Sequence, residues 1–127
     1  MREIKFRAWD KEEQEMLDWD KFFNLDIAQV FESKGSWGVY PMQYTGLKDS
    51  HGNEVYEGDI LEMAGQSLLR FEIVYEDDHM AFVRKWIDKR VPATRGNGET
   101  ERLSANTDIL EIIGNRFENP ELLEGNR

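Results

Sequence analysis

The feature that most constrains the fold is a succession of short alternating segments separated by glycine-rich and aspartate-rich turns. Residues 42–63, "MQYTGLKDSHGNEVYEGDILEM", contain two strand-like pieces around the turn "KDSHGN". Residues 69–76 alternate again, and "MAFVRKWI" returns after the turn "EDDH". "DILEIIGNRF" adds a strand-like piece near the end. About five short strands joined by tight turns predict a mainly β fold, with a small, partly closed β-barrel over about residues 42–127.

The first part of the chain predicts an N-terminal β extension over residues 1–41. In "REIKFRAWD", Ile4, Phe6 and Ala8 fall on one face of a strand and polar residues alternate with them. A second strand centred on residues 16–17 completes a hairpin with it.

Three further segments have their own signals. Residues 20–38 permit either a helix or irregular extended structure, because apolar residues at helical spacing occur together with aromatic and β-branched ones. Residues 88–106 are rich in glycine and charge and predict a long exposed loop. Asn119 as N-cap followed by Pro120 predicts a short C-terminal helix.

Composition limits the compartment and the chemistry. The chain has 127 residues, which fits one domain of ordinary size. It contains no cysteine, which excludes disulfides and thiolate catalysis and fits a reducing compartment. No signal-peptide or membrane-spanning stretch is present, so we expect a soluble, cytoplasmic protein that contacts no membrane.

Several glycines and aspartates are predicted to shape turns or bulges rather than to form an active site. In "DSHGN", Gly52 is expected at positive φ, with Asp49 or Asn53 closing a side-chain turn. In "YEGDI", Gly58 is expected at a bulge or tight bend that Asp59 holds by bonding to backbone donors. The full set of predicted structural positions is Gly46, Asp49, Gly52, Gly58, Asp59 and Gly114.

The sequence holds few candidates for catalytic or metal-binding residues. "DSHGNE" lacks the ligand spacing of a calcium loop. Glu57 and Asp59 could serve a hydrolase as an acid–base pair, but no nucleophile or cationic partner accompanies them. His51 and His79 have no metal-ligand spacing. We therefore predict no catalytic residue, no metal site, no cofactor and no enzymatic activity.

A basic segment interrupts an otherwise acidic chain. The net charge is −10, yet residues 84–95 contain five basic residues and one acidic residue. Such a strip with an interleaved tryptophan could bind single-stranded nucleic acid, although the overall charge disfavours that partner. The alternative is a solvated strand face over a buried tryptophan. The candidate contacts are Arg84, Lys85, Trp86, Lys89 and Arg90.

Parts of the sequence resemble the YopX family of phage and prophage proteins. The resemblance rests on "IKFRAWD", "QYTGLKDSHGNEVYEGDIL" and "IIGNRFENPELLE". It implies an SH3-like barrel in the C-terminal part and a gene carried by a phage or prophage, and it implies no activity. The sequence departs from the family at Arg116 and Phe117, where members usually carry an apolar residue and a tyrosine or similar residue, and this makes that strand end more basic.

These observations together predict a non-enzymatic interaction or regulatory module in the bacterial host cell. We expect the partner to be a protein, including further copies of this chain, because exposed Trp9, Trp19 and Trp37 would be costly on a monomer. Two alternatives stay open. One is single-stranded nucleic-acid binding through residues 84–95, and the other is an acidic DNA mimic that inhibits a host protein.

Overall fold

The computed structural model describes residues 3–23, 38–77, 80–88, 100–102 and 108–124. Strands dominate this part of the chain, which confirms the predicted mainly β class. The elements are β1 Phe6–Asp10, β2 Glu15–Leu17, α1 Trp19–Phe23, β3 Val39–Lys48, β4 Glu54–Tyr56, β5 Asp59–Met63, β6 Gln66–Glu76, β7 Ala81–Trp86, β8 Thr100–Arg102, β9 Leu110–Asn115 and the 3₁₀ helix η2 Pro120–Glu124.

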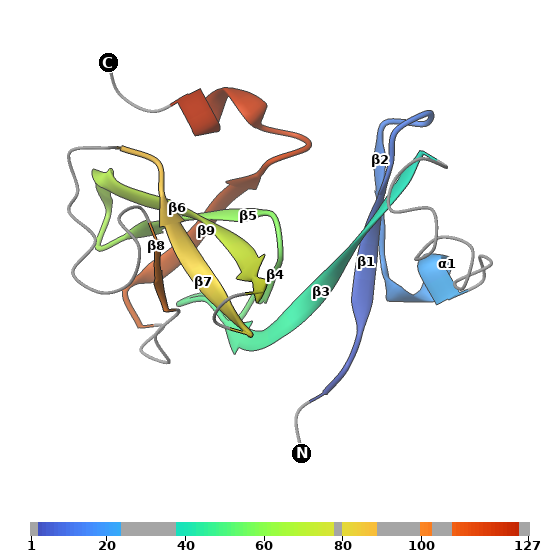
Figure 1. Cartoon of the computed structure of the whole chain (residues 1–127), viewed down its shortest axis with the longest axis horizontal. Coiled ribbons are helices and arrows are strands. Elements are labelled where there is room, and N and C mark those ends of the chain that lie inside the picture. The colour runs from blue at the N-terminus through green and yellow to red at the C-terminus, as the bar shows by residue number, and fades with distance from the viewer. Residues whose placement is uncertain (1–2, 24–37, 78–79, 89–99, 103–107, 125–127) are drawn as a thin grey trace.

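Two antiparallel sheets organise these strands. One has the order β2-β1-β3-β4, and the other has the order β8-β7-β6-β5-β9 (Figure 1). The longer strand β3 pairs with β1 near its start and with β4 near its end. It runs through residue 42, where the predicted barrel begins. The N-terminal strands and the first hairpin of the C-terminal part therefore share one sheet.

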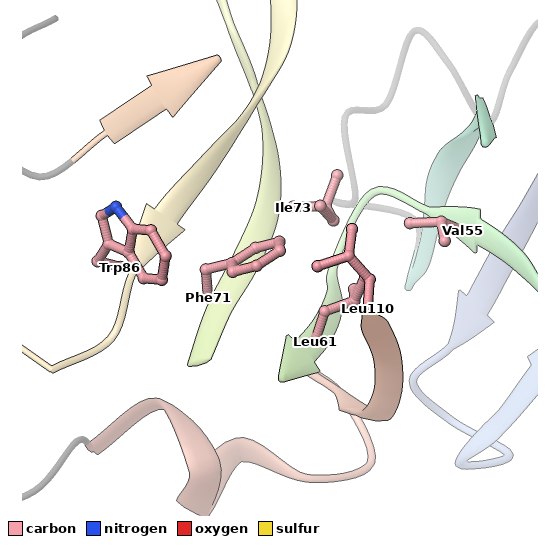
Figure 2. Packing of buried hydrophobic residues seen from close by; sticks show 6 residues of the cluster. All are labelled: Val55, Leu61, Phe71, Ile73, Trp86 and Leu110. Atoms are coloured by element: carbon pink, nitrogen blue, oxygen red, sulfur yellow. The ribbon is translucent and has the colours of Figure 1, made fainter. Parts of the chain in front are cut away.

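The main core lies against the five-stranded sheet. Phe71 and Ile73, two residues apart on β6, are fully buried, as period-two alternation requires. Leu61 of β5 and Trp86 of β7 pack beside them, and Val55 lies at the other side of the cluster (Figure 2). Phe71 and Trp86 meet edge to face with ring centroids 5.4 Å apart.

A second, smaller core belongs to the N-terminal hairpin. Ala8 of β1 pairs with Leu17 of β2, which confirms the predicted hairpin centred on residues 16–17. Phe22 of α1 is fully buried against them. The helix α1 covers only residues 19–23 of the segment whose structure the sequence left open, and residues 24–37 lie outside the described part of the chain.

The other face of β1 joins the two sheets. The guanidinium of Arg7 lies 2.7 Å from an oxygen of Asp59 in β5, whereas the ion pair of Lys5 with Glu54 of β4 stays within the four-stranded sheet. Trp9 stacks on Phe117, with ring centroids 5.6 Å apart and planes 15° apart. Trp9 is only 6% exposed, so the expectation that it is an exposed aromatic is wrong. Its ring is covered from within the same chain.

Two further segments differ from expectation. The exposed loop predicted for residues 88–106 is wrong at β8, where residues 100–102 pair with β7. The sequence "TER" has no alternation of apolar and polar residues, so it forms a strand only because it pairs with β7. The predicted C-terminal helix begins at Pro120 and is a 3₁₀ helix.

Candidate functional site

Asp49 connects the β3–β4 turn to a distant strand. Its Oδ1 accepts hydrogen bonds from the backbone N–H groups of His51 and Asn53, each at 2.9 Å. Its Oδ2 accepts one from the N–H of Ile112 in β9, at 3.1 Å. Burial raises the pKa of Asp49, but these backbone donors outweigh burial and leave the pKa lowered. Both oxygens are thus committed to the fold.

The turn between β4 and β5 is built around Gly58 and Asp59. Gly58 has φ +84°, and a Cβ there would lie 3.2 Å from the sulfur of Met42. Asp59 Oδ2 accepts a hydrogen bond from Tyr56 N–H at 2.8 Å, and Oδ1 accepts one from Arg7 at 2.7 Å. Asp59 is 2% exposed, and burial raises its pKa against the opposing charge of Arg7. Both oxygens are thus engaged by groups of the fold.

The remaining predicted turn positions lie at three separate places. Gly46 and Gly52 have positive φ, of 90° and 83°, within and after β3. Gly114 of β9 approaches Asn119 so closely that a Cβ would lie 2.5 Å from its side-chain oxygen. That oxygen accepts a hydrogen bond from Asn115 N–H at 3.1 Å. Gly114 therefore leaves room for the turn that follows β9.

The basic segment places two of its five candidate nucleic-acid contacts, Arg84 and Trp86, in buried positions on β7. Arg84 is 9% exposed and lies over the ring of Phe71, 5.4 Å from its centroid. Trp86 is 8% exposed and packs in the main core, so its ring has no free face for a base. Lys85 is exposed on β7. Lys89 and Arg90 lie outside the described residues.

A pocket of about 280 Å³ opens between β3, β6 and the segment after β9. Its walls combine aromatic, acidic and basic side chains from four parts of the chain. The lining residues are Tyr40, Pro41, Met42, Glu57, Gly58, Glu72, Ile73, Val74, Tyr75, Arg116 and Phe117. Arg116, with half of its side chain exposed, and Tyr75, which is 46% exposed, lie toward solvent. Sequence reasoning missed this pocket.

Glu72 is the most unusual residue in the pocket. Its neighbours Phe71 and Ile73 point into the main core, so alternation along β6 turns Glu72 to the opposite face. Glu72 is 5% exposed, and its buried Oε2 accepts no hydrogen bond. A guanidinium nitrogen of Arg116 lies 3.2 Å from that oxygen without hydrogen-bond geometry. Burial raises the pKa of Glu72, opposed by Arg116 and Lys85.

A second carboxylate, Glu57, lines the same pocket. Its Oε1 accepts a hydrogen bond from the backbone N–H of Gln43 in β3, at 2.9 Å. Burial raises the pKa of Glu57, and the Gln43 bond opposes this shift. Arg116 is the one basic side chain among the described lining residues, so the two carboxylates leave a net negative charge in the pocket, which favours ligands that carry positive charge.

The aromatic wall of the pocket is held rigidly. Phe117 lies between Trp9 and Tyr40, with ring centroids 5.6 Å and 5.5 Å away. Tyr75 packs edge to face on Phe82 at the other side. These contacts fix flat apolar surfaces beside the two carboxylates. The sequence signal for this site was Glu72 itself, a charge between two core residues.

Metal and membrane chemistry receive no support in the described region. No group of three or more histidine, aspartate or glutamate side chains within it could hold a metal ion. His51 is exposed and its Nε2 lies 3.6 Å from Glu111, while His79 lies outside the described residues. No helix among the described residues has the length and apolar character needed to cross a membrane.

Comparison with known proteins identifies relatives over nearly the whole chain. A crystal structure of protein EF1440 from Enterococcus faecalis is similar, with TM-score 0.61, 27% identity, and coverage of 98% of this chain and 100% of that one. The X-ray structure of protein yopX from Bacillus subtilis shares the fold, with TM-score 0.55, 17% identity and coverage of 97% and 98%. Curated protein sequences give no match. The family profile described as "YopX protein" matches residues 5–124, and the chain therefore belongs to the YopX family.

Proposed function

We propose that this chain is a non-enzymatic interaction module that receives a segment of a partner protein in the pocket between β3 and β6. Glu72 supports this proposal: its buried Oε2 lines the pocket and accepts no hydrogen bond, and its one ion-pair partner at this oxygen among the described residues is the half-exposed Arg116, 3.2 Å away. A buried oxygen without a hydrogen bond costs the fold stability, of order 1–3 kcal/mol or more for a charged group. A bound partner that donates to this oxygen would offset that cost.

The composition of the pocket supports binding over catalysis. Among the described residues that line it, none is Ser, Thr, Cys, His or Lys. Asp59, one half of the acid–base pair considered for a hydrolase, is engaged by Arg7 and Tyr56 and lies outside the pocket lining. Glu57 lines the pocket without Asp59, so the pair does not act together there.

The partner is proposed to be a different protein rather than a second copy. Self-association was expected from three exposed tryptophans, but Trp9 is buried against Phe117, Trp19 is half-buried, and Trp37 lies outside the described residues. We further propose that the interaction takes place in the cytoplasm of a bacterium that carries the gene on a phage or prophage, which fits membership of the YopX family. Nucleic-acid binding through residues 84–95 and mimicry of DNA stay alternative predictions.

Affinity capture with a pocket-filling variant tests the proposal. Val74 lines the pocket on β6, whereas Leu68 lies on the same strand outside it and is 38% exposed. Tagged wild type, Val74→Phe and Leu68→Phe would be used to capture partners from bacterial cells that express the chain, with and without nuclease. We expect one protein to be retained by wild type and Leu68→Phe and lost with Val74→Phe.

Two results would contradict the proposal. One is identical capture by all three folded proteins, because the pocket would then play no part. The other is capture that nuclease treatment abolishes, which would favour the nucleic-acid alternative. Backbone amide spectra of both variants would establish that Val74→Phe leaves the fold intact outside the pocket.

A further inference from the structure

We infer that the group of the partner that enters this pocket is an arginine side chain. This inference rests on the proposed function, since it names the chemistry of the partner at the same site. It follows from the size of the pocket, from its charges and from its flat aromatic walls.

The volume fits one long side chain. Pockets for complete small-molecule ligands span about 300–1,000 Å³. The pocket here, about 280 Å³, falls just below that range. A single side chain delivered by a polypeptide fits this space, and the polypeptide itself would remain outside. The exposed Tyr75 at the edge would contact the backbone of such a segment.

The charges select a cation. Glu57 and Glu72 both line the pocket, and Glu72 Oε2 has an unused acceptor site. The protein as a whole carries a net charge of −10, which favours approach of a basic partner. A guanidinium carries five N–H donors in a planar fork, and this geometry suits bonding to a carboxylate such as that of Glu72.

The chain already places one guanidinium, that of Arg116, beside the carboxylate of Glu72. Arg116 lies 3.2 Å from Glu72 Oε2 without forming a hydrogen bond, and half of its side chain is exposed. Its aliphatic stem packs near Gly58. Arg116 therefore acts as a weak internal competitor at the rim, which an incoming arginine with better geometry displaces toward solvent.

The aromatic wall favours arginine over lysine. Tyr40 and Phe117 line the pocket, and the guanidinium of Arg116 already lies over the ring of Phe117, 5.9 Å from its centroid. A planar guanidinium stacks on such rings and is weakly hydrated, whereas an ammonium is compact and strongly hydrated. Arginine can use carboxylates and rings at the same time, so its side chain matches the pocket better.

Titration of the ¹⁵N-labelled full chain with N-acetyl-arginine-N-methylamide tests the inference. We expect saturable shifts at the amides of Glu72, Val74 and Arg116, and at least tenfold weaker binding of the matching citrulline amide, which has the same shape without the charge. Glu72→Gln should weaken arginine binding about tenfold, the scale of one charged hydrogen bond.

Arg116→Met gives the most discriminating result, because it keeps the stem near Gly58 and removes the competing charge. We expect it to bind the arginine amide several-fold more tightly than wild type. Equal binding of arginine and citrulline amides, or no saturable shift, would overturn the inference. Loss of binding in Arg116→Met would also overturn it, because an anionic ligand would then be the better match.

Failure of this inference can be distinguished from failure of the proposed function. If Val74→Phe abolishes capture of a partner but the arginine amide does not bind, the interaction module stands and the assigned side chain is wrong. If the amide binds and no partner depends on Val74, the proposed function is wrong.

Discussion

Asp49 is a single carboxylate that holds a turn and a distant strand together, and its replacement tests that role. Replacement by Ala removes the acceptors for three backbone N–H groups, of His51, Asn53 and Ile112. We expect Asp49→Ala to lower the free energy of unfolding by about 3 kcal/mol, measured by urea denaturation. Asp10→Ala is the matched control, because Asp10 also accepts from two backbone N–H groups but only within an exposed turn. An equal loss in both variants would contradict the role.

The pH dependence at Asp49 follows from its lowered pKa. The folded pKa lies below the usual value of 3.8, so the stability from ionised Asp49 is fully present above about pH 4. It is lost as pH falls through the lower folded pKa. The difference in unfolding free energy between wild type and Asp49→Asn should therefore shrink between pH 6 and pH 2.5. If the difference in unfolding free energy stays constant over that pH range, the pKa of Asp49 is not lowered by folding.

The contribution of Glu72 to the free energy of unfolding is expected to change with pH in the opposite direction to that of Asp49. Burial raises its pKa, so its contribution favours folding at pH values below the unfolded pKa of about 4.3 and is lost as pH rises through the folded pKa. We expect Glu72→Gln to be more stable than wild type by about 1 kcal/mol at pH 7, and nearly equal to it at pH 4. Urea denaturation at both pH values measures this. A less stable variant at pH 7 would show that the contact with Arg116 outweighs burial.

At the scale of elements, one face of β1 links the N-terminal hairpin to β5. Arg7 is the central contact, because it is bonded to Asp59 and lies over the ring of Tyr56, 4.8 Å from its centroid. Arg7→Met leaves Asp59 buried without its cation, and we expect a loss of about 3 kcal/mol. Denaturation of Arg7→Met, Asp59→Asn and the double variant measures the coupling between these two residues.

The double variant should be less destabilised than the sum of the single variants, by about 1–3 kcal/mol. The reason is that no uncompensated charge remains once both partners are neutral. Additive losses would show that the two side chains stabilise the fold independently.

Most elements could be predicted from the sequence because their signals are local. The alternation of apolar and polar residues predicted β1, β6 and β7. The hairpin centred on residues 16–17 was predicted because a short second strand follows the first strand closely. Turn chemistry identified "DSHGN" and "YEGDI" as bends. β8 could not be predicted, because "TER" becomes a strand only through pairing with β7. Long-range pairing leaves no pattern in the segment itself.

The pocket could not be predicted for a related reason. Tyr40, Glu57, Glu72 and Arg116 come from four segments, and only the packing of two sheets brings them together. The alternation over residues 69–76 places Glu72 on the face of its strand opposite Phe71 and Ile73, and the polar face of a strand is ordinarily solvated. In the structure that face is covered by other parts of the chain, so a charge expected in water is buried.

At the scale of the whole molecule, both sheets should be needed for folding. A chain beginning at Met42 lacks β1 and β2, which leaves Asp59 without Arg7 and Phe117 without Trp9. We expect it to lose cooperative thermal unfolding, measured by circular dichroism. A chain beginning at Glu3 keeps β1 and is the control. Cooperative unfolding of the shorter chain would show that residues 42–127 form an independent domain.

Site-specific photo-crosslinking in bacterial cells tests the central claim, an interaction pocket for arginine, most directly. A benzophenone side chain replaces Tyr75, which is 46% exposed and lines the pocket, or Leu68, which is 38% exposed and lies outside it. We expect position 75 to link to one partner protein through a peptide that contains arginine, and position 68 not to link to it. Two results would contradict this claim. One is that position 75 links to no protein beyond those linked from position 68, and the other is that the linked peptide contains no arginine.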